Sequence, residues 1–85
     1  MYVVAKHEIS DPARFWAAVQ EATPNIPEGV KLHYALPNTA GSAAVCLWEA
    51  GSVNTVRDLV ESAVGAVSRN EYYEVDRKNA VGLPQ

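Results

Sequence analysis

Cysteine is nearly absent from this 85-residue chain, which contains only Cys46. One thiol cannot form a disulfide within the chain, so no cross-link compensates for the small core of a domain of this size. Pairs of cysteines with zinc-finger spacing are also missing. A hydrophobic content of 48% still suffices for a folded core, and burying one sheet face against a second copy would add stability. We therefore expect a homodimer.

Basic residues are few and scattered. The chain has 7 Lys and Arg against 10 Asp and Glu, with a formal net charge of −3. Nucleic-acid binding needs a concentrated basic surface, so we expect no nucleic-acid partner. No apolar run approaches the roughly 20 residues of a membrane span, and no signal peptide is recognisable at the start. We expect a cytoplasmic protein without membrane association.

Several motifs of known chemistry are missing. The chain has no glycine-rich phosphate loop and no G-x-S-x-G elbow, and it carries no flavin or nucleotide signature. The RNA-binding version of a small α+β fold carries aromatic residues in a K/R-G-F/Y run, which residues 43–48 do not match. The function therefore has to be inferred from individual side chains.

The periodic segments occur in the order strand, helix, strand, strand, helix, strand. Hydrophobic residues alternate with period two in the expected strands, and they recur at helical spacing after two capping sequences, Asp11-Pro12 and Ser52. The expected strands are residues 2–9, 30–36, 43–50 and 72–76. This order predicts an α+β, ferredoxin-like βαββαβ domain over residues 1–85, with a four-stranded antiparallel sheet and two helices on one face. Residues 77–85 form a C-terminal tail, apolar enough to dock on a partner subunit.

Two histidines are the first candidates for chemistry. His7 lies near the end of the first expected strand and His33 in the middle of the second. In the ferredoxin-like order one strand separates them, so their backbones are about 10 Å apart. If both side chains face the same way, they can hold a transition metal such as nickel or zinc between them. The alternative is that each histidine is a half-exposed strand residue with its own hydrogen bond.

The strand between the histidines supplies further candidates. Cys46 and Trp48 share one face of it, and Glu49 follows at its end. Tyr34 and Tyr72 have hydroxyls that could point at a ligand on a half-open barrel. The alternatives are that Cys46 and Trp48 belong to the core, that Glu49 is a solvated strand end, and that the tyrosines cover an edge strand.

Three short segments resemble a known superfamily. They are the opening Tyr2-Val3-Val4-Ala5-Lys6-His7, the Leu32-His33-Tyr34 sequence and Cys46-Leu47-Trp48-Glu49-Ala50. They resemble the dimeric α+β-barrel proteins, and within them small stand-alone domains that include nickel-binding bacterial proteins. The resemblance implies a dimer whose sheets enclose a ligand cavity, with His7 and His33 as metal-binding positions. The haem-degrading relatives need a histidine on the second helix, which this chain lacks, so no haem is expected.

Three hypotheses for function follow. The first is a homodimeric binding protein that holds a transition metal or small ligand at the open sheet face. The second is a cofactor-independent monooxygenase or cyclase with a histidine base beside an aromatic pocket. The third is a structural dimerisation module. An error of one residue in strand register would turn every named side chain to the opposite face.

Overall fold

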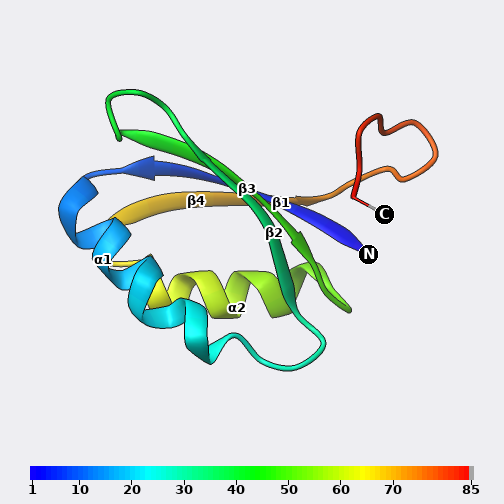
Figure 1. Ribbon diagram of the computed structural model, residues 1–85, viewed down its shortest axis with the longest axis horizontal. Coiled ribbons are helices and arrows are strands. Elements are labelled where there is room, and N and C mark those ends of the chain that lie inside the picture. Colours follow the sequence, from blue (N-terminus) through cyan, green and yellow to red (C-terminus); the bar gives the residue numbers. More distant parts are fainter. Residues whose placement is uncertain (85) are drawn as a thin grey trace.

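The computed structural model describes residues 1–84 and contains one four-stranded sheet (Figure 1). The strands run in the spatial order β2-β3-β1-β4, and every neighbouring pair is antiparallel. Both α-helices cover the same face of the sheet (Figure 1). This is the predicted ferredoxin-like α+β fold. Its elements are β1 (Tyr2–Ile9), α1 (Pro12–Ala22), the short 3₁₀ turn η1 (Thr23–Asn25), β2 (Lys31–Pro37), β3 (Ala43–Glu49), α2 (Val53–Val64) and β4 (Ser68–Glu74).

The two helices begin where the sequence predicts. The Asp11 side chain accepts a hydrogen bond from the backbone N–H of Arg14, and the Ser52 side chain accepts one from that of Thr55. Each cap satisfies a backbone donor that has no partner within its helix. Pro12 occupies the first helical position, where a missing N–H costs nothing.

The core lies between the sheet and the helices. On β1 the buried residues are Val3, Ala5, His7 and Ile9, and on β3 they are Ala44, Cys46 and Trp48. His7 was expected at the open sheet face, but it lies on the face that the helices cover. The buried residues of β1 and β3 lie on the same face of the sheet, because Ala5 pairs directly with Cys46. The helices contribute mainly Phe15, Val56, Val60 and Val64. This face of the sheet is the inner face of the fold.

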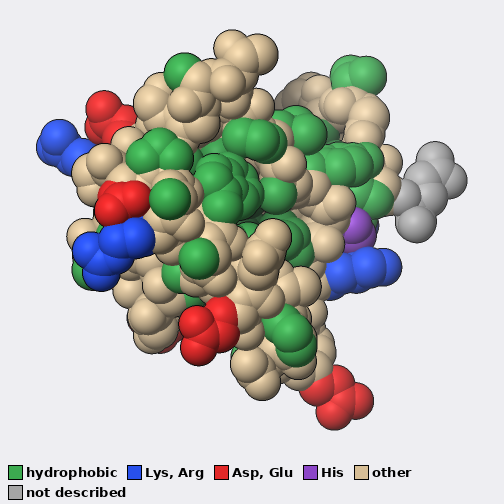
Figure 2. Space-filling model, turned by 60° about the vertical axis from the view of Figure 1, so that its left-hand side comes forward, with side chains coloured by type: hydrophobic (Ala, Val, Ile, Leu, Met, Phe, Trp, Pro, Cys, Tyr) green, Lys and Arg blue, Asp and Glu red, His purple; other side chains and the backbone are tan. Residues whose placement is uncertain are grey.

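The opposite, outer face of the sheet is not covered by any helix. The apolar run in β3 predicts burial on both faces, but Val45 is 42% exposed. The prediction is wrong for the single chain, because both helices pack on the inner face alone. Leu36, which pairs with Val45, is also exposed. Figure 2 views the molecule from another side, where apolar side chains gather in the middle and most charged ones lie around the margin.

Strand β2 contains a bulge that the sequence pattern does not reveal. Leu32 pairs with Trp48 and Tyr34 pairs with Leu47, so His33 is an extra residue between two successive pairs. A bulge shifts the alternation of faces by one residue. Leu32 therefore shares the inner face with Ala35 and not, as predicted, with Tyr34.

Strand β4 begins at Ser68, four residues before the predicted start at Tyr72. Its first half, Ser-Arg-Asn-Glu, has no hydrophobic alternation. Its inward polar side chain Asn70 is accommodated because it is hydrogen-bonded, which composition alone does not indicate.

The C-terminal tail folds back toward the start of β1, and the two termini lie at the same end of the molecule (Figure 1). The Tyr2 hydroxyl donates a hydrogen bond to the carbonyl oxygen of Pro84 at 2.9 Å, and the Arg77 guanidinium lies over the Tyr2 ring. Val81 is 98% exposed. Within residues 1–84 no helix has the length and apolarity to cross a membrane.

Candidate ligand pocket

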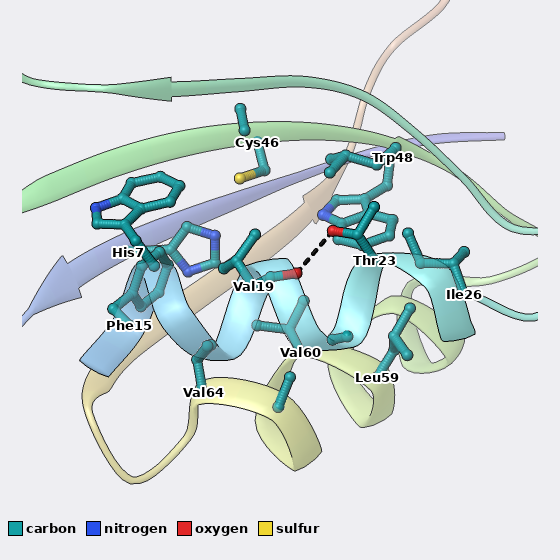
Figure 3. A pocket seen from close by; sticks show the side chains of 15 residues that line it. His7, Phe15, Val19, Thr23, Ile26, Cys46, Trp48, Leu59, Val60 and Val64 are labelled. Carbon is teal, nitrogen blue, oxygen red and sulfur yellow. Dashed lines mark hydrogen bonds between the residues drawn. The ribbon is translucent and has the colours of Figure 1, made fainter. Parts of the chain in front are cut away.

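A pocket lies between the inner face of the sheet and the two helices (Figure 3). Its volume is about 50 Å³, which is room for a few water-sized groups. Its walls are almost entirely hydrocarbon, contributed by α1, α2, β2 and β3. The residues that matter for its chemistry are His7, Phe15, Trp16, Cys46, Trp48 and Val60.

The indole of Trp48 contributes a polar atom without a partner. Trp48 is 7% exposed, and its Nε1 is buried without a hydrogen-bond acceptor among residues 1–84. An unsatisfied buried donor costs roughly 1–3 kcal/mol, and native proteins contain few of them.

His7 contributes the second polar group of the pocket. Its imidazole projects from β1 into the space between sheet and helices (Figure 3), and the residue is 5% exposed. The ring packs against Phe15, with centroids 5.3 Å apart. Nδ1 is 2.6 Å from the Asn70 side-chain oxygen. Nε2 has no protein hydrogen-bond partner among the residues that the structure describes.

Asn70 links His7 to a network on the side of the pocket formed by β4 and α2. Its amide nitrogen donates to Glu61 Oε2 at 2.8 Å, and its side-chain oxygen also accepts from the Ser68 hydroxyl. The Tyr72 hydroxyl donates to the same carboxylate oxygen. The Arg57 guanidinium lies over the Tyr72 ring, 5.3 Å from its centroid. The network holds Asn70 in one orientation.

Burial and this network set the protonation states of the pocket. Burial lowers the pKa of His7, and the hydrogen bond that its Nδ1 donates to the Asn70 side-chain oxygen and the charge of Glu61 only partly oppose that effect. His7 is therefore neutral at neutral pH. Hydrogen bonds from Tyr72 and Asn70 lower the pKa of Glu61, so this carboxylate stays ionised. Burial, followed by the hydrogen bond to Glu61, raises the pKa of Tyr72.

Cys46 lies on the inner face, as expected for a residue that shares a face with Trp48. Burial raises the pKa of its thiol to about 11. A thiol is a good metal ligand or nucleophile only as thiolate. Cys46 therefore forms part of the pocket wall as a small apolar group.

The second histidine lies on the outer face, away from the pocket. His33 Nε2 is 2.9 Å from Glu49 Oε1, and its ring is 5.6 Å from that of Tyr2. The structure thus separates His7 from His33, and a single chain does not bring them together at one metal. Within residues 1–84 no group of three His, Cys, Asp or Glu side chains could hold a metal ion.

The remaining predicted site residues are divided in the same way. Tyr34 lies on the outer face and Tyr72 on the inner face, where it contacts Glu61 and does not line the pocket. Of the site residues predicted from the sequence, the structure brings His7, Cys46 and Trp48 together at the pocket. The others lie elsewhere. Sequence reasoning missed Asn70 and Glu61, and the only available signal was the period-two spacing of Asn70 and Tyr72.

The fold and the pocket together define a small ferredoxin-like α+β domain with an apolar cavity beneath its sheet. No protein-family model, curated protein or solved structure matches the chain.

Proposed function

We propose that this chain is a homodimeric binding protein that holds a small, mostly apolar organic molecule between its sheet and its helices. The observation that carries the proposal is a pocket with an almost entirely hydrocarbon wall that includes His7 and Trp48, whose Nε1 is buried beside it without a hydrogen-bond partner among residues 1–84. Ligand sites are typically apolar with a few convergent polar groups. A core built for packing alone has no need of an unsatisfied donor.

The same observation favours an organic ligand over a metal at this place. The wall contains one histidine, and its only other soft ligand, Cys46, is protonated at neutral pH. The metal site predicted from His7 and His33 would require residues from a second chain. The test below therefore includes metal binding by the dimer as the outcome that would contradict an organic ligand.

Dimerisation through the outer face completes the proposal. Four large hydrophobic side chains of this face are between 42% and 61% exposed in the single chain: Tyr34, Leu36, Val45 and Tyr73. Contiguous apolar surface of this kind is typical of an interface. Opposite charges lie beside one another across strands β1 and β4, where Lys6 pairs with Glu71 and Glu8 with Arg69. The resemblance to dimeric α+β-barrel proteins implies the same arrangement.

An enzyme with His7 as general base is the second candidate. A neutral imidazole with a free Nε2 in an apolar pocket has the features of such a base. The test is incorporation of solvent deuterium into an activated C–H bond of a bound ketone. No exchange above the rate seen with His7→Phe would exclude this use of the pocket.

The binding proposal is tested with xenon, an apolar probe small enough for a pocket of about 50 Å³. We expect saturable binding, measured by ¹²⁹Xe NMR, that is lost when Ala63→Leu fills the pocket. Ala63 lines the pocket, whereas Ala17 is exposed on α1, so Ala17→Leu is the matched control and should bind as the original chain does. Circular dichroism checks that both variants are folded. Equal binding by both variants, or uptake of nickel or zinc in place of xenon, would overturn the proposal.

A further inference from the structure

We infer that Val81, in the C-terminal tail, docks into a groove on the outer face of a second copy of this chain. The inference rests on the proposed function, because it requires the homodimer that forms through the outer faces. It adds the contact between a projecting side chain and a groove that lie at opposite ends of one face. In a two-fold symmetric dimer this contact occurs twice, once for each tail.

The tail is an ordered projection, held at both of its ends. Directly after β4, the Asp76 side chain accepts a hydrogen bond from the backbone N–H of Lys78 at 3.0 Å. At the far end, the Tyr2 hydroxyl donates to the carbonyl oxygen of Pro84 at 2.9 Å. Gly82 has a φ of +86°, a conformation that glycine adopts without strain, and the chain turns back toward Tyr2 there. The segment between these two attachments therefore has a defined shape.

Val81 lies between the two attachments and is 98% exposed. Single exposed apolar residues are common on protein surfaces, so its position and not its exposure decides the argument. The tail packs on Tyr2, an outer-face residue of β1, and Figure 1 shows the tail on the side of the sheet away from the helices. Val81 therefore stands beside the surface through which the homodimer forms.

A groove lies at the opposite end of the outer face. It has a volume of about 420 Å³, and its apolar wall includes Leu36 and Val45, which are both exposed in the single chain. The four charged residues of its wall are two cations and two anions, which neighbour one another across β1 and β4. Because these charges balance, the groove carries no net charge that an apolar side chain would leave uncompensated.

The places of the tail and the groove fit one kind of two-fold axis. The tail lies where β1 begins, at Tyr2, and the groove lies where β1 ends, at Lys6 and Glu8. If the axis runs across the strands, the start of β1 in one chain lies over the end of β1 in the other. Each tail then meets the groove of the other chain. An axis along the strands would bring the two tails together instead.

The direct test is disulfide cross-linking of a chain that carries both Val81→Cys and Leu36→Cys. A disulfide requires Cα atoms within about 7 Å of one another. The two positions lie at opposite ends of the outer face, so a bridge between them must join two chains. We expect a covalent dimer on a non-reducing gel and a peptide bridge between positions 81 and 36. The native Cys46 is buried and does not compete.

The control for cross-linking combines Val81→Cys with Ala17→Cys, which is exposed on α1. Position 17 lies on the helical side of the fold, so no bridge between positions 81 and 17 should form. A bridge between two copies of position 81, with none between positions 81 and 36, would show the tails meeting each other and would overturn the inference.

The second measurement is the dissociation constant of the dimer, from sedimentation velocity over a range of concentrations. Val81→Asp should raise it about tenfold or more, because the dimer loses two buried valine side chains. Ala17→Asp introduces the same charge on α1 and should leave the constant unchanged. Because Val81 is almost fully exposed in the single chain, its replacement does not disturb the fold.

The outcomes separate this inference from the proposed function. An original chain that dimerises, with the same dissociation constant in Val81→Asp, would overturn the inference and leave the homodimer standing. A monomeric original chain would overturn both. The mass of the original chain is measured without any substitution, so this distinction does not depend on how a variant behaves.

Discussion

The two faces of the sheet place the same residue type in contrasting environments. On the inner face His7 is 5% exposed, packs on Phe15 and bonds to a neutral amide. On the outer face His33 lies in a β-bulge and contacts the carboxylate of Glu49. The inner face therefore makes a neutral, oriented imidazole, and the outer face makes a polar contact at an uncovered surface. Residue type alone did not determine the role of either histidine.

The largest expected difference between the faces concerns stability. Phe15 is 1% exposed at the centre of the inner core. Phe15→Ala should lower the free energy of unfolding by about 3–5 kcal/mol, because it removes buried hydrocarbon and leaves a cavity. Urea denaturation measures the change. A loss below about 1 kcal/mol would show that the inner face is not the principal core.

The outer face should instead determine assembly. Val45→Asp places a charge in the middle of the exposed apolar surface, so we expect the dimer to dissociate, because burying an unpaired charge is costly. Light scattering coupled to size-exclusion chromatography measures the mass. Ser62→Asp, an exposed change on α2, should leave the dimer intact. A monomeric original chain, or a dimeric Val45→Asp variant, would contradict the proposed interface.

Acid should distinguish the two histidines. The folded-state pKa of His7 lies below the 6.5 of an unperturbed histidine, so the unfolded chain binds more protons between these two values. This contribution to stability is complete above pH 6.5 and decreases as the pH falls from there toward the folded-state pKa. Its slope is at most about 1.4 kcal/mol per pH unit.

Urea titrations over this pH range should show the slope in the original chain and in His33→Phe, and a flatter profile in His7→Phe. Glu61 faces His7 through Asn70 but titrates below its ordinary value of 4.5, while the Cys46 thiol titrates near pH 11. Tyr72 has a raised pKa and stays neutral. A slope that survives in His7→Phe would assign it to another group.

The smallest expected effect concerns the exposed end of the network. Glu61→Gln keeps the shape of the side chain but removes its charge, so the bonds from Asn70 and Tyr72 weaken. We expect a loss of about 0.5–1 kcal/mol at neutral pH, because Glu61 is exposed to solvent. Thermal denaturation measures it, with Glu21→Gln, an exposed change on α1, as the control. An equal loss of stability in both variants would show that the hydrogen bonds of Glu61 to Asn70 and Tyr72 contribute nothing particular.

Much of the fold followed from alternation in the sequence, and the caps followed from local chemistry. The alternation of faces along β1 and the location of Cys46 and Trp48 on one face of β3 were predicted correctly, since both strands keep strict period two. The bulge at His33 was not predictable, because it depends on how β2 pairs with β3 and not on the alternation of residues within β2. That bulge shifted the faces of β2.

The site was only partly predictable for a related reason. His7 and Trp48 were identified, but the sheet face to which they belong turned out to be the covered one. Asn70 lies before the predicted start of the last strand, and only its hydrogen bonds to His7 and Glu61 in the structure show its role. Polar residues that are buried through mutual hydrogen bonds resemble surface residues in sequence, so the network became visible only in three dimensions.

The most direct test of the account is a titration of the original chain with xenon, followed on the indole N–H resonance of Trp48 in a ¹⁵N-correlated NMR spectrum. The account predicts a saturable shift of this resonance, because Trp48 lines the pocket. An indole resonance that stays unchanged while xenon saturates the protein would contradict the proposed role of the pocket.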